Sequence, residues 1–352
     1  MKKLKVGVIG VGNISSTHIE GYLQNPACEL YAFCDINPAT LKEKGEKYGV
    51  TRLYESCDRM LAELPELDAV SVCTWNNAHA PCTIAALNAG KHVFCEKPMA
   101  MNATEAEKMR AAAEKAGKVL GVGFVRRFGN DADLARALVE DGKMGEIYYA
   151  KANYIRRHGN PGGWFSDKSR SGGGPLIDLG VHVIDLVRYI AGNPKPVSVY
   201  GATFRKLDRS MIKDTRGYVV TGSDIRKDVC DVEDLAAAMI RFENGCVLTV
   251  ETSYSLNTDR DTGRVEIFGT KGGIIIDPDL SFHSVLEDRM TDVIFPSSTA
   301  FNGTEYAKEI DNFVSAILHG TPLRAPAEDG IQLMRILDAV YESARTQSEV
   351  KL

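Results

Sequence analysis

The first third of the chain alternates strand-like and helix-like segments in a regular order. Short apolar runs rich in valine are separated by stretches of helical pattern, and glycine or aspartate bounds many of the runs. The expected strands cover 5–10, 28–35, 52–56, 68–74, 91–97 and 118–124, and the expected helices cover 14–24, 38–48, 57–64, 77–89 and 102–116. Strands that alternate with helices indicate a parallel sheet covered on both faces. The pattern therefore predicts an α/β fold with a Rossmann, doubly wound sheet.

After residue 125 this order changes. We expect a helix near 131–141, a strand at 146–156, a glycine-rich loop and a helix that begins near 176. The later strand-like runs cover 197–204, 234–242, 246–255, 263–270 and 272–278, and helical runs follow at 304–319 and 328–346. Strands that follow one another without helices indicate an antiparallel sheet, and "ENGC" and "GTKGG" supply turn residues between them. We predict a Rossmann domain over 1–125 and an α+β domain with a large, mostly antiparallel sheet over 126–352.

Length and composition narrow the classes of protein. A chain of 352 residues exceeds the size at which single cores stop growing, which favours two domains. The net charge is −5 and no basic run occurs, so no nucleic-acid partner is expected. No apolar stretch is long enough to span a membrane, and glycines interrupt the apolar run near the N-terminus. The eight cysteines form no CxxC pair, which predicts reduced thiols, a cytoplasmic protein and no metal site.

The segment "VGVIGVGNISSTH" at 6–18 follows the first expected strand and opens a helix. Gly10 permits a tight turn, and Gly12 lets the backbone approach a pyrophosphate at the helix N-terminus. Asn13 and Ile14, at the same N-terminus, are further candidates for cofactor binding. Ser15 occupies the third position of the fingerprint, where glycine or alanine is usual, and it is small enough for close helix–strand packing. The segment therefore predicts a dinucleotide site.

Asp35 ends the second expected strand, twenty residues after Ser15. A carboxylate there accepts hydrogen bonds from the adenosine ribose hydroxyls and repels a 2′-phosphate. The next residues, Ile36 and Asn37, provide no arginine for that phosphate. We therefore predict NAD as the cofactor and regard NADP as the less favoured one. A simple turn role for Asp35 in "DINPAT" is the alternative.

The segment "CTWNNAHA" at 73–80 follows the fourth expected strand. Thr74, Trp75 and Asn76 are candidate cofactor contacts, because ligands bind at the carboxyl edge of such sheets. Helix capping by Asn76 or Asn77 is the alternative. His79 is a further candidate, for which we favour a structural role.

The segment "CEKPMA" at 95–100 ends the fifth expected strand with Glu96, Lys97 and Pro98. A charged pair interrupts an apolar strand at the ligand edge, which places Glu96 and Lys97 among the cofactor-site candidates. Lys97 would lie at the nicotinamide end of a bound dinucleotide. The alternative is an ordinary solvated lysine.

The segment "GGGPLIDLGVHVID" at 172–185 places Asp178 and His182 four residues apart, on one face of an expected helix. Metal binding would need further ligands, and no His/Cys cluster accompanies the two residues. A buried structural pair remains open. Acid–base chemistry is the favoured interpretation, because histidine titrates near neutrality and can take the proton of an alcohol.

Together, "GVIGVGNISSTH", "CEKPMA" and "GGGPLIDLGVHVID" resemble the Gfo/Idh/MocA family of NAD(P)-dependent sugar and polyol oxidoreductases, over essentially the whole chain. The resemblance implies that Lys97 belongs to the substrate and cofactor site, and that Asp178 and His182 orient the substrate and move its proton. It also implies a homodimer or homotetramer formed through an exposed face of the second domain's sheet. Ser15 and Trp75 depart from the family pattern.

We therefore expect hydride transfer between a secondary hydroxyl of a sugar, glycoside or cyclitol and the nicotinamide of NAD. Candidate substrate contacts are polar or aromatic residues near the expected active edge: Arg127, Asn153, Tyr154, Arg156, Arg157, His158 and Trp164. Two alternatives are a glycoside 3-oxidoreductase and a redox-neutral glycosidase, both with tightly bound NAD. A non-catalytic NAD sensor is disfavoured, because it would not need Lys97, Asp178 and His182 together.

Overall fold

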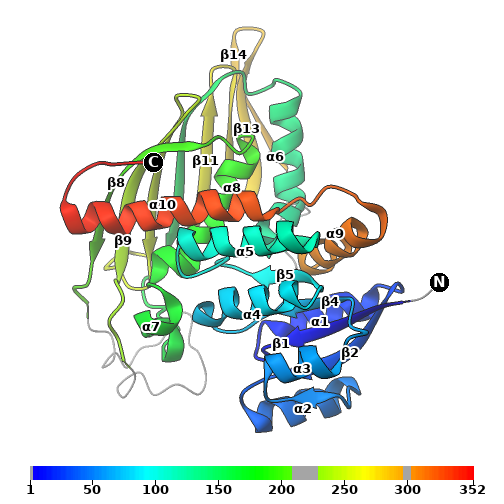
Figure 1. The fold of residues 1–352 in the computed structure, drawn as a ribbon. Helices are drawn as coiled ribbons and strands as arrows, with labels where there is room; N and C mark the ends of the chain where they lie inside the picture. The colour runs from blue at the N-terminus through cyan, green and yellow to red at the C-terminus, as the bar shows by residue number, and fades with distance from the viewer. Residues whose placement is uncertain (1–2, 208–228, 296–302) are drawn as a thin grey trace. The chain divides into compact units, whose positions relative to one another are not determined.

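The computed structural model describes residues 3–207, 229–295 and 303–352 (Figure 1). Its contacts divide the chain into two compact units, which we describe separately. Unit 1 comprises Met1–Phe128 and Asn302–Ile331, and unit 2 comprises Gly129–Phe301 and Gln332–Leu352. Unit 1 is thus discontinuous in sequence. The division into functional domains at residue 125 remains a prediction, since contacts alone do not assign a function to either part.

Unit 1 contains a six-stranded sheet in the order β3-β2-β1-β4-β5-β6, and all its strand pairs are parallel. The strands are β1 (Leu4–Ile9), β2 (Cys28–Cys34), β3 (Leu53–Tyr54), β4 (Ala69–Val72), β5 (His92–Glu96) and β6 (Leu120–Gly123). The helices are α1 (Ser15–Gln24), α2 (Pro38–Tyr48), α3 (Cys57–Glu63), α4 (Asn76–Asn88), α5 (Ala103–Ala116) and α9 (Glu305–His319), and η1 (Val125–Phe128) is a 3₁₀ turn. The order reverses between β1 and β4, which confirms the predicted doubly wound sheet.

Local sequence explains where these helices begin and end. The Asn37 side chain accepts hydrogen bonds from the backbone N–H groups of Ala39 and Thr40 at the start of α2, and Gly49 ends that helix in a left-handed conformation. Asn102 and Gly117 play the same two roles for α5. These capping residues are why the predicted helix limits agree closely with the observed ones.

Helix α9 contributes to the core of unit 1 although it is remote in sequence. Its Phe313 is fully buried, and the Phe313 and Phe94 ring centroids lie 5.3 Å apart. Gly21 of α1 allows close packing, because a Cβ there would lie 2.9 Å from Cγ1 of Ile310 in α9. The Rossmann core is therefore completed by a late segment of the chain.

Unit 2 contains a nine-stranded sheet in the order β14-β13-β12-β11-β7-β10-β9-β8-β15, in which β10 and β7 are parallel and the other pairs antiparallel. Its strands are β7 (Ile147–Ile155), β8 (Pro196–Phe204), β9 (Leu235–Phe242), β10 (Val247–Ser253), β11 (Thr262–Gly269), β12 (Gly272–Asp277), β13 (Asp279–Leu286), β14 (Arg289–Phe295) and β15 (Val350–Lys351). Its helical segments are α6 (Asn130–Glu140), η2 (Gly163–Ser166), α7 (Lys168–Ser171), η3 (Leu176–Gly180), α8 (Val181–Ile190) and α10 (Ala327–Thr346). The first five residues of α10 belong to unit 1. The predicted α+β architecture with a mostly antiparallel sheet is confirmed.

The two faces of this sheet differ in cover. Ala150 and Ala152 of β7 and Leu248 and Val250 of β10 are buried on the face that carries α8 and α10 (Figure 1). Alternate side chains point to the other face, the open face, where Tyr200 of β8 is exposed. The alternation of buried and exposed positions follows the period of two that strands require.

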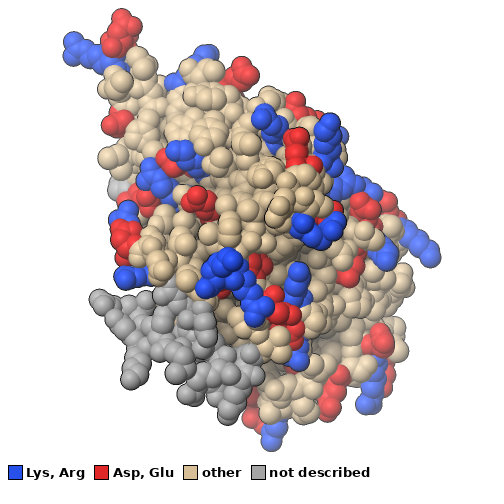
Figure 2. All heavy atoms as spheres, turned by 90° about the vertical axis from the view of Figure 1, so that its left-hand side faces the viewer, with Lys and Arg blue, Asp and Glu red and all other residues tan. Residues whose placement is uncertain are grey.

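The surface carries mixed charge. Figure 2 shows acidic and basic side chains interspersed on one face of the molecule, with no extended area of one sign among its described residues. Within the described ranges, no helix has the length and apolarity needed to cross a membrane.

The role of α9 predicts a large effect of truncating its buried aromatic residue. Phe313→Ala should lower the free energy of unfolding by about 3–5 kcal/mol, because it leaves a cavity beside Phe94. Leu318→Ala on the same helix is the control: Leu318 is 43 % exposed, and its loss should cost no more than about 0.5 kcal/mol. Urea unfolding measures both values, and equal effects would show that α9 does not belong to the core.

Candidate functional site

The turn after β1 leaves space for a ligand. Gly10 has a φ of +83°, and a Cβ there would lie 2.7 Å from the backbone of Cys73 and Thr74, so only glycine fits. Gly12 differs, because a Cβ at this position would meet no atom within 4 Å. Asn13 is exposed next to it, and Ile14 is the N-cap of α1 without a side-chain cap. The turn therefore fits the approach of a pyrophosphate to the N-terminus of α1.

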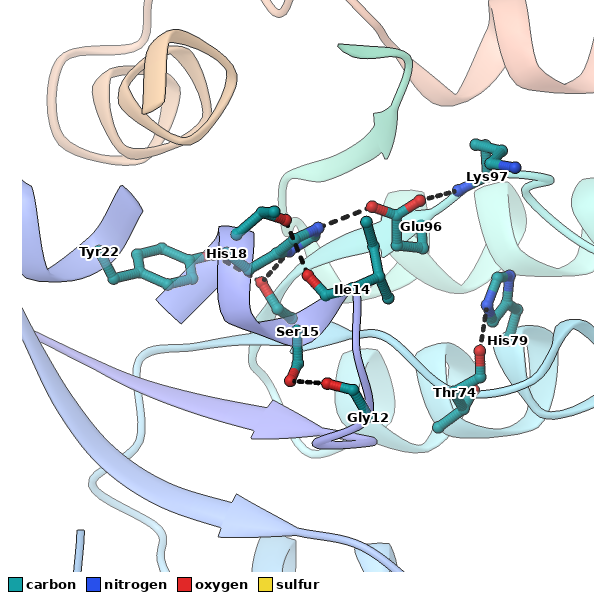
Figure 3. Close-up of polar contacts among 11 residues, drawn as sticks. Gly12, Ile14, Ser15, His18, Tyr22, Thr74, His79, Glu96 and Lys97 are labelled. Carbon is teal, nitrogen blue, oxygen red and sulfur yellow. Dashed lines mark hydrogen bonds and ion pairs between the residues drawn. The ribbon is translucent and has the colours of Figure 1, made fainter. Parts of the chain in front are cut away.

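Two polar side chains fix the shape of this turn. The buried Ser15 donates from Oγ to the carbonyl oxygen of Gly12 at 2.7 Å, so the departure from the usual residue adds a hydrogen bond (Figure 3). Asp35 accepts from the N–H of Val11 through Oδ2 at 2.7 Å and from the N–H of Asn37 through Oδ1 at 2.8 Å. Asp35 thus has the turn role that we considered, and its carboxylate keeps further lone pairs for ribose hydroxyls.

The loop after β4 carries the next candidates. Trp75 is 37 % exposed and occupies the N-cap position of α4 without a side-chain hydrogen bond, whereas the buried Asn76 is the first helical residue. Capping by Asn76 or Asn77 is therefore wrong, because Trp75 occupies the cap position and these two residues are the first and second of the helix. Thr74 donates from Oγ1 to the carbonyl oxygen of Trp75 at 3.1 Å.

His79 connects this loop to the one after β5. Its Nδ1 lies 2.7 Å from the carbonyl oxygen of Pro98, and its Nε2 lies 3.1 Å from that of Thr74. Burial lowers the pKa of His79, so the neutral ring donates to one carbonyl at a time. These contacts match the structural role that we favoured for His79.

Glu96, the last residue of β5, lies between His18 and Lys97, with only 6 % of its surface exposed (Figure 3). Its Oε2 accepts from the N–H of Lys97 at 2.9 Å, and its Oε1 lies 2.8 Å from Nε2 of the buried His18. Burial raises the pKa of Glu96, but the hydrogen bond from His18 and the nearby charge of Lys97 help to outweigh it and lower that pKa overall. The buried group is therefore a carboxylate.

In unit 2, the segment that carries Asp178 and His182 begins as a π turn, η3, before the regular helix α8. The N–H of Val181 donates to the carbonyl of Leu176, five residues earlier. We expected a regular helix from 176. The wider turn packs against β10, where a Cβ on Gly180 would lie 3.3 Å from Cγ2 of Thr252.

Exposure separates Asp178 and His182 from their neighbours. Across 173–188, a stretch described in full, every residue is buried except these two, which are partly exposed. An acid–base group must reach its substrate, whereas a structural pair gains nothing from exposure. This pattern favours the catalytic interpretation of both side chains over the structural one.

The glycines before this segment permit an unusually close contact. A Cβ on Gly173 would lie 1.9 Å from the hydroxyl of Tyr341, and one on Gly174 would lie 2.5 Å from the carbonyl oxygen of Glu233. Glu233 accepts from the N–H groups of Gly174 at 3.0 Å and Leu176 at 3.2 Å, and from the Tyr341 hydroxyl at 2.8 Å. A buried carboxylate thus holds the first turn of η3 in place.

The candidate substrate residues on β7 point in opposite directions. Tyr154 packs against Leu179 and the buried Tyr254, on the same side of the sheet as η3. Asn153 is its neighbour in the strand and therefore lies on the open face. Adjacent residues of a strand face opposite sides of the sheet, so only Tyr154 of this pair lies on the side of η3, and a substrate contact by Asn153 stays a prediction. Burial raises the pKa of Tyr254, and the nearby charges of Asp178 and Glu233 raise it further.

The other candidates have different surroundings. Arg127 has no exposed surface and pairs with Asp329 at 2.7 Å, so a structural role replaces the predicted substrate contact. The Arg156 guanidinium lies 5.5 Å from the centre of the Tyr154 ring, and the Trp164 ring stacks on Phe165. Arg157 is exposed, and its N–H donates to Asp261.

His158 forms an isolated bridge with Ser255. Arg156, Tyr154 and Trp164 remain candidate substrate contacts. The described residues contain no group of three or more His, Cys, Asp or Glu side chains suited to a metal ion.

Three polar residues at these segments were not predicted from the sequence: His18, Glu233 and Tyr254. His18 stands in the quoted glycine segment, three residues after Ser15, so its place on the buried face of α1 was a usable signal. Glu233 precedes β9 and carries no local motif. Its partners Gly174 and Tyr341 are distant in sequence, so spacing alone could not identify it.

Comparison with known proteins identifies the family of the chain. The NAD-binding Rossmann-fold domain of the Gfo/Idh/MocA oxidoreductase family matches residues 4–124, and the C-terminal α/β domain of that family matches 136–352. A D-glucoside 3-dehydrogenase of Escherichia coli is 33% identical over 352 residues, which cover 99% of this chain and 97% of the relative. A myo-inositol 2-dehydrogenase of Thermotoga maritima is 29% identical, covering 99% of this chain and 98% of the relative. The solved structure of a levoglucosan dehydrogenase in complex with NADH superposes with a TM-score of 0.87 at 26% identity, and 99% of each chain is covered.

The glycine turn yields a paired prediction. Gly12→Val should weaken NADH binding at least about tenfold, because the new side chain fills the space left for the pyrophosphate, while the free energy of unfolding changes by less than about 1 kcal/mol. Gly10→Ala should instead destabilise the fold by about 1–3 kcal/mol, because it combines a positive φ with a backbone clash. Fluorescence titration with NADH and urea unfolding separate the two effects. Wild-type affinity in Gly12→Val would contradict the assigned cofactor position.

Proposed function

Because the chain belongs to the Gfo/Idh/MocA family of oxidoreductases, we propose that it is an NAD-dependent dehydrogenase that oxidises a secondary hydroxyl of a sugar, glycoside or cyclitol. The observation that carries the proposal is the partial exposure of Asp178 and His182 in an otherwise buried segment. The relatives named above act on a glucoside and an inositol, which supports a ring hydroxyl as the reacting group. The doubly wound sheet and its glycine turn fit NAD.

Each of the proposed catalytic residues has a defined task. The glycine turn at Gly10 and Gly12 would hold NAD, which would supply the acceptor for the hydride from the carbinol carbon. His182 takes the proton of the substrate hydroxyl, since a neutral imidazole is a suitable base near neutral pH. Asp178 orients the histidine or a neighbouring hydroxyl, and the Lys97 ammonium stabilises the negative charge that develops on the substrate oxygen.

The cofactor residues divide by the part of NAD that they would hold. Gly10, Gly12, Asn13 and Ile14 form the pyrophosphate turn, and Asp35 would accept hydrogen bonds from the adenosine ribose. The partly exposed Trp75 offers a flat apolar surface beside Thr74. A carboxylate at Asp35 disfavours the 2′-phosphate of NADP through like-charge repulsion, which supports NAD as the preferred cofactor.

An assay of NADH absorbance with NAD and a panel of inositols, hexoses and glycosides tests the proposal. A dissociable dehydrogenase gives a rise that continues over many turnovers with at least one member of the panel. A rise that stops at one equivalent of enzyme would instead indicate a retained cofactor and a redox-neutral or transfer cycle. No rise with any polyol, under conditions in which NADH binds, would contradict the proposed function.

A substitution of His182 tests its proposed role as the base. His182→Ala should lower kcat by roughly 10²–10⁴, the usual contribution of one acid–base group, and leave NADH affinity unchanged, since the proposed task of His182 concerns the substrate hydroxyl and not the cofactor. His319→Ala is the matched control, because His319 is exposed at the end of α9 in a position with no proposed role. Near-wild-type turnover in His182→Ala would exclude His182 as the base.

We also infer a homodimer or homotetramer formed through the open face of the unit 2 sheet. Exposed apolar side chains on that face, including Tyr200, Met239, Met290 and Ile294, support an interface. Light scattering in solution should give a multiple of the chain mass, and the mass of a single chain would contradict the interface.

All eight cysteines are free, which supports the predicted cytoplasmic location.

A further inference from the structure

A continuous series of buried polar groups in unit 1 leads to the backbone of Lys97 (Figure 3). The Tyr22 hydroxyl lies 2.8 Å from Oγ of Ser71, and that oxygen lies 3.2 Å from Nδ1 of His18. Nε2 of His18 contacts Glu96, which accepts the N–H of Lys97. Tyr22, Ser71 and His18 are each almost completely buried, so bulk water does not supply alternative partners for their polar atoms.

The chemistry of the end groups gives these hydrogen bonds a direction. A carboxylate only accepts, so Nε2 of His18 donates to Glu96. In a neutral ring Nδ1 then accepts, which makes Ser71 the donor to His18 and Tyr22 the donor to Ser71. Burial raises the pKa of Tyr22, so this hydroxyl keeps the proton that it donates. Each polar hydrogen in the series thus has an acceptor.

Glu96 has little freedom to adopt another position. A Cβ added to Gly123 of β6 would lie only 3.3 Å from Cδ and Oε2 of Glu96, so the carboxylate packs directly against that strand. One oxygen is assigned to His18 and the other to Lys97, and the His18 and Phe94 ring centroids lie 5.2 Å apart. The orientation of the carboxylate is therefore set from the His18 side.

We propose that His18 is a positioning residue for Lys97: it fixes the Glu96 carboxylate, which in turn holds the Lys97 backbone at the end of β5. The inference rests on the proposed role of Lys97 in the reaction, but its physical content concerns the backbone hydrogen bond alone. Loss of the His18 donor leaves Oε1 of Glu96 buried without this partner, and the carboxylate then reorients and releases the Lys97 N–H.

Hydrogen exchange at the Lys97 amide tests this without any assay of activity. His18→Leu should accelerate exchange of the Lys97 N–H at least about tenfold. His18→Gln should return exchange to within about threefold of wild type, because its carboxamide N–H₂ can replace Nε2 as the donor to Glu96. Tyr22→Phe removes a buried hydrogen bond from the same core without touching Glu96, and should leave the Lys97 amide protected.

Three results would overturn the proposal. Unchanged exchange at Lys97 in His18→Leu would show that Glu96 does not depend on His18. Equally faster amide exchange throughout α1 and β5 in His18→Leu would show a general packing defect. The same conclusion would follow if Tyr22→Phe accelerated exchange of the Lys97 N–H as much as His18→Leu does. If His18→Leu does not fold, exchange in His18→Gln and Tyr22→Phe is compared instead. Faster exchange of the Lys97 N–H in His18→Gln, with no change in Tyr22→Phe, would contradict the assignment of the hydrogen-bond donor to Glu96.

Kinetics then connect positioning to the reaction. With the polyol that the assay identifies, His18→Leu should lower kcat by roughly 10–100-fold with little change in NADH affinity, and His18→Gln should restore it. An enzyme without polyol activity would refute the proposed function and leave the exchange result standing. Altered exchange with an unaltered kcat would refute the link between His18 and catalysis.

Discussion

Carboxylates that accept backbone N–H groups hold the loops on which the proposed site depends. Asp35 holds the glycine turn through Val11, Glu96 holds the start of the loop after β5 through Lys97, and Glu233 holds the start of η3 through Gly174 and Leu176. Hydrogen bonds to an ionised acceptor are roughly twice as strong as neutral ones, and a buried carboxylate has few other partners. The loops are thereby fixed by electrostatics where regular secondary structure ends.

Close approach of the backbone is the second condition for this arrangement. Gly10 faces the backbone of Cys73 and Thr74, and Gly174 faces the backbone of Glu233, so each contact excludes a side chain. Gly12 has the opposite environment, since no atom lies near its missing Cβ. Glycines that look equivalent in the sequence therefore do two different things: some bring protein segments together, and one leaves space for a ligand.

The local sequence pattern predicted much of the fold, and there are physical reasons why it did not predict the remaining elements. The Rossmann strands were predictable because both faces are buried and their runs are nearly uninterrupted. Strands β13 and β14 were missed because many of their side chains are exposed and polar residues such as Ser281, His283 and Asp292 interrupt the pattern. The π turn at Leu176–Gly180 packs against β10, which is distant in the chain, so local spacing could not predict it. Its cause is thus a long-range contact, whereas β13 and β14 were missed because their own pattern is weak.

Histidine shows how surroundings separate residues of one chemical type. His18 is enclosed between Ser71 and Glu96, and His79 lies between two carbonyl groups in an environment that disfavours its charged form. Neither ring can reach a substrate, whereas His182 is partly exposed beside fully buried neighbours. A base must gain and lose its proton in each catalytic cycle, and a ring whose two nitrogens are committed to buried partners is poorly suited to that exchange. Accessibility, together with hydrogen-bond commitment, therefore supports the proposal that His182 transfers the proton, whereas His18 and His79 contact groups of the surrounding backbone and side chains.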